Sequence, residues 1–295
     1  MSRTHQAIRR AQEELRATGA EALPRQNLVD LAKELTKEFV AERRTVENIH
    51  ATGKPESSRS LTELEDFPNL IMSPDAKVVA ITAAGSPASR EYRRLGERLE
   101  RWEKGDLGTL IVAGSRRGEG ATVTATNLGL ALAQDSTRKV LLVDANLSHP
   151  GVGSLLGFPK QTEGLSQFLA DDLPLTGVVY RTAISNFCVT PSGSDPQSNQ
   201  SPLTAKIGTF LEQVSERFDW IVIDSPPVAC TSFEVLSQFA DGILLVAKAM
   251  ETSSRELSAS LSKLQNARLL GFVLNEVASL RKSNFSYGEA DSHPL

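Results

Sequence analysis

A glycine-rich stretch between an apolar run and a helical pattern is the strongest candidate for chemistry in this sequence. The run Thr109–Ala113 leads into Gly-Ser-Arg-Arg-Gly-Glu-Gly-Ala-Thr, residues 114–122, and Asn-Leu-Gly-Leu-Ala-Leu-Ala follows at residues 127–133. A turn of this kind exposes successive backbone N–H groups at a helix N-terminus, where the helix dipole favours a phosphate. We therefore expect nucleotide contacts from Ser115, Arg116, Arg117, Gly118, Glu119, Gly120, Ala121 and Thr122.

This loop departs from the phosphate-loop pattern GxxxxGK[ST] at its lysine. Ser115 holds the first glycine position and Ala121 holds the lysine position. The lysine of such loops reaches the β- and γ-phosphates, and losing one such donor typically costs about 10²–10³ in rate. We expect binding of ATP or ADP with Mg²⁺ to be weakened, with Thr122 still able to reach the metal. Arg116 is a candidate for restoring some charge, or Arg116 and Arg117 both face solvent.

Two aspartates follow apolar runs that read as strands. Asp144 ends Val-Leu-Leu-Val-Asp, and Asp224 ends Trp-Ile-Val-Ile-Asp. A strand-end aspartate beside a phosphate loop is the usual Mg²⁺ holder in nucleotide sites. We expect Asp144 and Asp224 to be the catalytic residues and, with Thr122, the metal ligands.

The elements that must position these residues alternate along the chain. Amphipathic stripes separate the short apolar runs, one of them around Leu99 and one opened by the capping-box pattern Ser253–Glu256. This alternation predicts an α/β fold, a parallel sheet with helices on both faces. The expected strands are Lys77–Thr82, Thr109–Ala113, Lys139–Asp144, Phe187–Thr190, Asp219–Asp224, Gly242–Ala247 and Leu269–Asn275.

The ends of the chain differ in character from this body. Residues 1–50 show helical spacing and predict a helical arm, which either packs on the body or docks on a partner. Residues 51–75 are rich in Ser, Pro, Gly and charge and read as a linker. Residues 76–280 form the expected phosphate-loop domain, and residues 281–295 read as a polar tail.

Composition excludes several classes of protein. The 295 residues are 40% hydrophobic and 23% charged, which argues against wholesale disorder. The 32 Lys and Arg against 36 Asp and Glu argue against a nucleic-acid partner. Apolar runs are too short to span a bilayer, and the first residues show no signal-peptide pattern, so we expect a cytoplasmic protein.

Taken together, the motifs resemble a known family. SRRGEGAT, VLLVDANLSHP, FDWIVIDSPPV, ADGILLVAKA and LLGFVLNEV stand in the order typical of the bacterial tyrosine kinases of capsule and exopolysaccharide synthesis, within the MinD/ParA-like P-loop class. The resemblance implies that residues 115–122 are the Walker A loop, Asp144 the first aspartate of Walker A′ and Asp224 the Walker B aspartate. It also implies an adenine contact from Asn275.

Several positions differ from the family pattern. Ala121 replaces the Walker A lysine, and Asn146 replaces the second Walker A′ aspartate. The assembly motif Glu-x2-Arg-x2-Arg keeps only its middle arginine, with Arg90 and Gly96 at the other positions, so a homo-oligomer stays an open question. The tyrosine-rich tail is reduced to Tyr287, the remaining phosphoacceptor candidate.

The resemblance and these losses together give three functional hypotheses. The favoured one is a catalytically impaired regulatory or scaffolding subunit of polysaccharide export. It would act at the inner membrane face through a membrane-anchored chain-length (co-polymerase) protein. One alternative is an active tyrosine autokinase with a substitute for the missing lysine. Another is a partition- or positioning-type ATPase switch.

Overall fold

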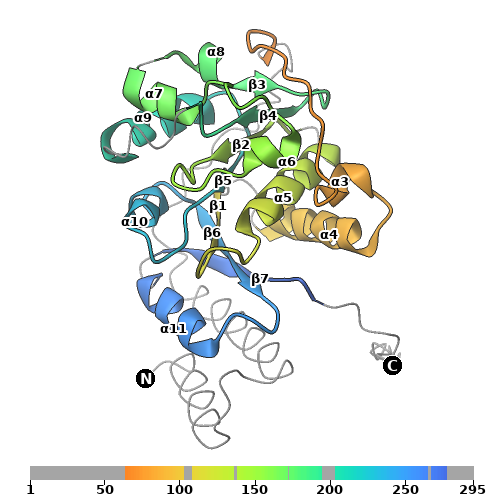
Figure 1. Ribbon diagram of the computed structural model, residues 1–295, viewed down its shortest axis with the longest axis vertical. Coiled ribbons are helices and arrows are strands. Elements are labelled where there is room, and N and C mark those ends of the chain that lie inside the picture. Colours follow the sequence, from red (N-terminus) through yellow and green to blue (C-terminus); the bar gives the residue numbers. More distant parts are fainter. Residues whose placement is uncertain are drawn as a thin grey trace, which may run out of the picture.

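A seven-stranded β-sheet organises the part of the chain that the computed structural model describes, residues 64–102, 108–135, 138–171, 173–194, 203–264 and 267–277 (Figure 1). The strand order is β3-β4-β2-β5-β1-β6-β7. Neighbouring strands pair in parallel, apart from the antiparallel pair β3–β4 at one edge. The strands are β1 (Thr109–Gly114), β2 (Val140–Asp144), β3 (Tyr180–Arg181), β4 (Phe187–Thr190), β5 (Trp220–Asp224), β6 (Gly242–Lys248) and β7 (Leu269–Asn275).

Helices cover both faces of this sheet. Side chains of α3 to α6 belong to one buried cluster, and side chains of α7 to α11 belong to a second cluster on the opposite face. The helices are α3 (Val79–Thr82), α4 (Pro87–Trp102), α5 (Ala121–Asp135), α6 (Val152–Leu156), α7 (Leu165–Asp171), α8 (Leu175–Val178), α9 (Leu203–Ser215), α10 (Thr231–Ser237) and α11 (Ser254–Lys263). The expected parallel sheet with helices on both faces is confirmed.

The central strands supply both clusters in turn. In β1, Ile111 and Ala113 join the α7–α11 side, while Leu110 and Val112 join the α3–α6 side. Side chains of a strand alternate between faces, so a strand with helices on both sides must be apolar throughout. This is why the central strands read in the sequence as unbroken apolar runs.

Six of the seven expected strands are present, and the expectation of a strand at Lys77–Thr82 is wrong. The segment instead forms α3, in which the amide of Thr82 donates to the carbonyl of Val78. The buried side chain of Asn127 satisfies its free backbone groups, donating to the Lys77 carbonyl and accepting from the Ala80 amide, each at 2.9 Å. These long-range contacts outweigh the β-propensity of its Val and Ile residues.

Residues 64–75, the end of the expected linker, pack on the sheet domain. Leu64 and Phe67 are each only 1% exposed. The Phe67 ring stacks on Phe218 with 6.1 Å between centroids, and the Arg217 guanidinium lies over it. Further along, the amide of Leu70 donates to the Arg181 carbonyl of β3. The expected arm at 1–50 and the tail at 281–295, with Tyr287, lie outside the described residues.

Replacing Phe67 tests whether this segment is part of the folded unit. Because Phe67 is buried and stacked, we expect Phe67→Ala to lower the free energy of unfolding by about 3–5 kcal/mol. Urea unfolding followed by circular dichroism measures the change. Ile71→Ala is the matched control, since Ile71 is 88% exposed. Equal stability of the two variants would contradict the packing described here.

Candidate functional site

The glycine-rich loop joins β1 to α5 at the carboxyl edge of the sheet. Gly118 and Gly120 have φ angles of 86° and 92°, in the left-handed region that glycine tolerates. At Gly120 a Cβ atom would also overlap the Asn275 side-chain amide. The backbone then enters α5, whose first hydrogen bond runs from the Thr124 amide to the Gly120 carbonyl at 2.9 Å. The loop thus has the conformation that a phosphate cradle at a helix N-terminus requires.

The two strand-end aspartates lie side by side at the same edge. Asp144 of β2 and Asp224 of β5 are register partners, and Val112 of β1 is the next partner of Asp224. Both carboxylates share the sheet face of Leu142 and Val222, which is the face that α5 covers. The fold therefore brings both aspartates beneath the first turn of the helix that carries Thr122.

Both carboxylates are fully buried, but their hydrogen bonding differs. Asp144 accepts from the backbone amides of Gly151 and Val152, each at 3.0 Å. Within the described part of the chain, neither carboxylate oxygen of Asp224 has a hydrogen-bond partner, nor has the buried hydroxyl of Ser115. Unpartnered buried polar atoms are uncommon in folded proteins and mark places where an ion or ligand would bind.

Burial changes the ionisation of the pair. Desolvation raises the pKa of Asp144 to about 6, in spite of its backbone hydrogen bonds. It raises the pKa of Asp224 well above the usual value, the negative charge of Asp144 raises it further, and the Thr122 hydroxyl opposes the rise. Two like charges on adjacent strands repel each other, and a divalent cation would relieve the repulsion.

The donor set at this position fits Mg²⁺. It consists of oxygen atoms from Asp144, Asp224 and Thr122, and Mg²⁺ binds through one or two carboxylates while keeping waters and phosphate oxygens as further ligands. No group of three or more His, Cys, Asp or Glu residues in the described ranges forms a metal cage. The site therefore has the composition of a metal position completed by a ligand.

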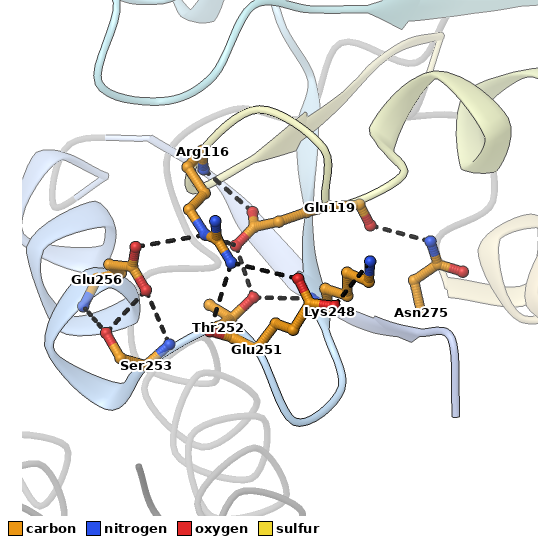
Figure 2. Close-up of polar contacts among 8 residues, drawn as sticks. All are labelled: Arg116, Glu119, Lys248, Glu251, Thr252, Ser253, Glu256 and Asn275. Atoms are coloured by element: carbon orange, nitrogen blue, oxygen red, sulfur yellow. Dashed lines mark hydrogen bonds and ion pairs between the residues drawn. The ribbon is translucent and has the colours of Figure 1, made fainter. Parts of the chain in front are cut away.

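Figure 2 shows a polar network that ties the loop to the β6–α11 connection. The Glu119 side chain is 1% exposed. One of its oxygens accepts from the Arg116 amide at 3.1 Å, and the other accepts from the Thr252 hydroxyl at 2.6 Å. The Thr252 hydroxyl in turn accepts from the Lys248 amide at 2.8 Å. The buried carboxylate thus fixes the shape of the loop from within the protein.

Arg116 belongs to the same network (Figure 2). Its guanidinium Nε lies 3.3 Å from a Glu256 carboxylate oxygen and 3.9 Å from one of Glu119, and Nη2 lies 3.7 Å from one of Glu251. Glu256 also completes the capping box with Ser253 that the sequence predicts for α11. The positive charge of Arg116 is therefore shared among three carboxylates, which makes it a poor replacement for the missing lysine.

Asn275 lies at the end of β7 and contacts the loop directly. Its side-chain Nδ2 donates to the Glu119 carbonyl at 2.9 Å (Figure 2). In this structure the amide nitrogen serves the loop backbone, while the expected adenine contact stays a prediction. Arg117 is exposed at the loop, and Ala121 is half-buried in the first turn of α5.

A cavity of about 530 Å³ lies over the loop, within the size range of small-molecule sites. Of the expected binding residues, Ser115, Asp144 and Asp224 are buried beneath the cavity and the others line it. The sequence reasoning missed Lys77, Tyr92 and His149, which also line it. No local motif marks them, because they come from α4 or from connecting segments. The lining is completed by Val79, Ala88, Gly114, Val123, Asn146, Ser225, Pro227 and Glu276.

The buried aspartate pair predicts an unusual effect of pH on stability. Because the pKa of Asp224 is raised in the folded state, the folded chain holds more protons than the unfolded chain, and stability falls as pH rises above about 4. We expect Asp224→Asn to unfold with a free energy higher than the natural chain at pH 8, by more than about 1 kcal/mol. The difference should shrink toward pH 4.

Urea unfolding at the two pH values measures this difference. Glu91→Gln is the control, since the Glu91 side chain is 69% exposed and its replacement should change stability by under about 0.5 kcal/mol. An Asp224→Asn chain that is less stable than the natural one at pH 8 would show that the pair is not strained.

Comparisons with known proteins agree with this geometry. Residues 109–270 match the family model described as AAA domain. The tyrosine-protein kinase ptk of Acinetobacter johnsonii is 30% identical over 172 residues, which are 57% of this chain and 23% of that protein. The tyrosine-protein kinase CpsD of Streptococcus agalactiae serotype Ia is 27% identical over 184 residues, which are 61% of this chain and 78% of that protein.

Solved structures show the same fold. The kinase domain of the Escherichia coli tyrosine kinase ETK matches with a TM-score of 0.64 at 23% identity, covering 80% of this chain and all of that domain. The VpsO kinase domain matches with a TM-score of 0.57 at 27% identity, covering 64% of this chain and 94% of that one. The chain thus spans whole kinase domains but under a quarter of the length of ptk. It belongs to the AAA domain family of P-loop proteins and, within that family, to the group of the bacterial tyrosine kinases.

Proposed function

We propose that this chain is a nucleotide-binding, tyrosine-kinase-like subunit of capsule or exopolysaccharide synthesis and export whose phosphoryl transfer is strongly reduced. The observation that carries the proposal is a preserved cradle and aspartate pair beside a lost lysine. Gly118 and Gly120 hold the loop open for a phosphate, and Asp144 faces Asp224 beneath it. Ala121 stands where the charged donor is needed.

Nucleotide binding is supported by the unpartnered polar atoms of the site. Asp224 and Ser115 are buried without hydrogen-bond partners among the described residues. Asp144, Asp224 and Thr122 would hold Mg²⁺, which when bound supplies positive charge beside the phosphates. ATP or ADP with Mg²⁺ is therefore the ligand class that this site fits.

Reduced transfer follows from charge. Catalysis of phosphoryl transfer depends on cations placed where negative charge develops in the transition state. Ala121 supplies none, Asn146 replaces a carboxylate of the family pattern, and Arg116 is neutralised by Glu119, Glu251 and Glu256. A chain of this kind suits a role in which binding, rather than turnover, carries the signal.

The partner we propose is a membrane-anchored polysaccharide chain-length protein. Among the described residues, no helix combines the length and the apolar character needed to cross a bilayer. Contact with the inner membrane face would then come through that partner, with residues 1–50 as the docking element. If deleting residues 1–50 left membrane recruitment unchanged in cells, this docking role would be wrong.

An active autokinase is the alternative, favoured by the retention of Thr122, Asp144 and Asp224. The two functions differ in the effect of restoring the lost groups. Under our proposal, Ala121→Lys combined with Asn146→Asp should transfer phosphate to a synthetic tyrosine peptide at least about 100-fold faster than the natural chain. Adding Asp144→Asn to this variant should abolish the gain.

Mass spectrometry of the phosphotyrosine product, with ATP and Mg²⁺ in excess, measures these rates. Circular dichroism of each variant serves as the folding control. A natural chain that already works as fast as the restored variant, and loses activity on Asp144→Asn, would establish the autokinase and refute reduced catalysis.

A further inference from the structure

Lys77 lies in the wall of the loop cavity although it is distant from the loop in the sequence. It lines the cavity together with Ala121 and Thr122. It directly precedes the buried Val78 and α3, in a segment that packs on α5. The fold thus brings a lysine to the cavity whose own loop has lost one.

The backbone of Lys77 is anchored to the helix that begins at the loop. The Lys77 carbonyl accepts from Asn127 Nδ2 at 2.9 Å, and the Lys77 amide donates to Asp75 Oδ1 at 2.8 Å. Asn127 is fully buried in α5 and also accepts from the Ala80 amide. The stem of the lysine therefore starts from a fixed point of α5, while its side chain is exposed and free to move.

The charge of Lys77 is available, unlike those of other cations near the loop. In the described part of the chain, no carboxylate lies within ion-pair distance of its ammonium. Arg116 is held by three carboxylates, and Lys248 pairs with Glu251 and Glu276 at 2.8 and 3.0 Å. A compact ammonium on a flexible stem is the group that phosphate oxygens bind in such loops.

We propose that the Lys77 ammonium replaces the missing loop lysine as the phosphate-binding cation of this site. The proposal rests on the nucleotide binding proposed above and names the residue responsible for it. A cation that holds bound and reacting phosphates equally well raises affinity without raising the catalytic rate. Lys77 is therefore compatible with a chain that binds nucleotide and transfers phosphate poorly.

Calorimetric titration of ATP with Mg²⁺ into the full chain tests this role. Since a hydrogen bond to a charged group is lost, we expect Lys77→Met to weaken ATP affinity about ten- to hundredfold. Lys160→Met is the matched control: Lys160 is also exposed, lies outside the cavity lining and carries the same charge. It should change the affinity by less than about twofold.

A second pair of variants tests whether Lys77 and the lost lysine serve the same phosphates. In a chain carrying Ala121→Lys, the added Lys77→Met should weaken binding by less than about threefold, because coupled groups are not additive. Thermal unfolding without nucleotide should give the same midpoint for the natural chain and for Lys77→Met. This confirms that the variant is folded.

The outcomes separate the two proposals. If the natural chain binds ATP and Lys77→Met binds it equally well, or if Lys160→Met loses as much, the role of Lys77 is refuted and nucleotide binding stands. If the natural chain does not bind ATP while Ala121→Lys does, both fail. A loss in Arg117→Met in place of Lys77→Met would assign the cation to the loop itself and overturn the proposal.

Discussion

The pairing of Asp144 with Asp224 across β2 and β5 is the constraint on which the site depends. Both carboxylates are fully buried, they face the same side of the sheet, and one of them has no hydrogen-bond partner in the described structure. Such an arrangement opposes stability unless a proton or a cation compensates it. A sequence that keeps both aspartates in this position keeps the electrostatic requirement of a metal site.

The loop above the pair is held from inside the protein. Glu119 contributes a buried carboxylate to the loop backbone and to Thr252, so part of the loop's hydrogen bonding is complete without a ligand. The same network uses the charge of Arg116. Structural order and phosphate neutralisation compete here for one arginine, and the geometry gives it to structural order.

This division accounts for a site that resembles a kinase site and lacks its strongest electrostatic element. The backbone cradle depends on glycine conformations and on the start of α5, which are local features. Charge stabilisation depends on one side chain at one position, Ala121. The first can therefore persist when the second is lost, because backbone donors need no particular side chain.

The sequence by itself determined the local parts: β1, the loop and α5 in succession, the strand-end positions of Asp144 and Asp224, and the capping box of α11. These follow from side-chain periodicity, glycine and cap chemistry, which act over a few residues. It did not reveal that Lys77–Thr82 is helical, since Asn127 satisfies that backbone from a distant helix. Nor did it reveal that Asn275 and Arg116 support the loop. Only the tertiary structure decided which cations are paired and which face the cavity, because ion pairs and cavity walls join segments far apart in the chain.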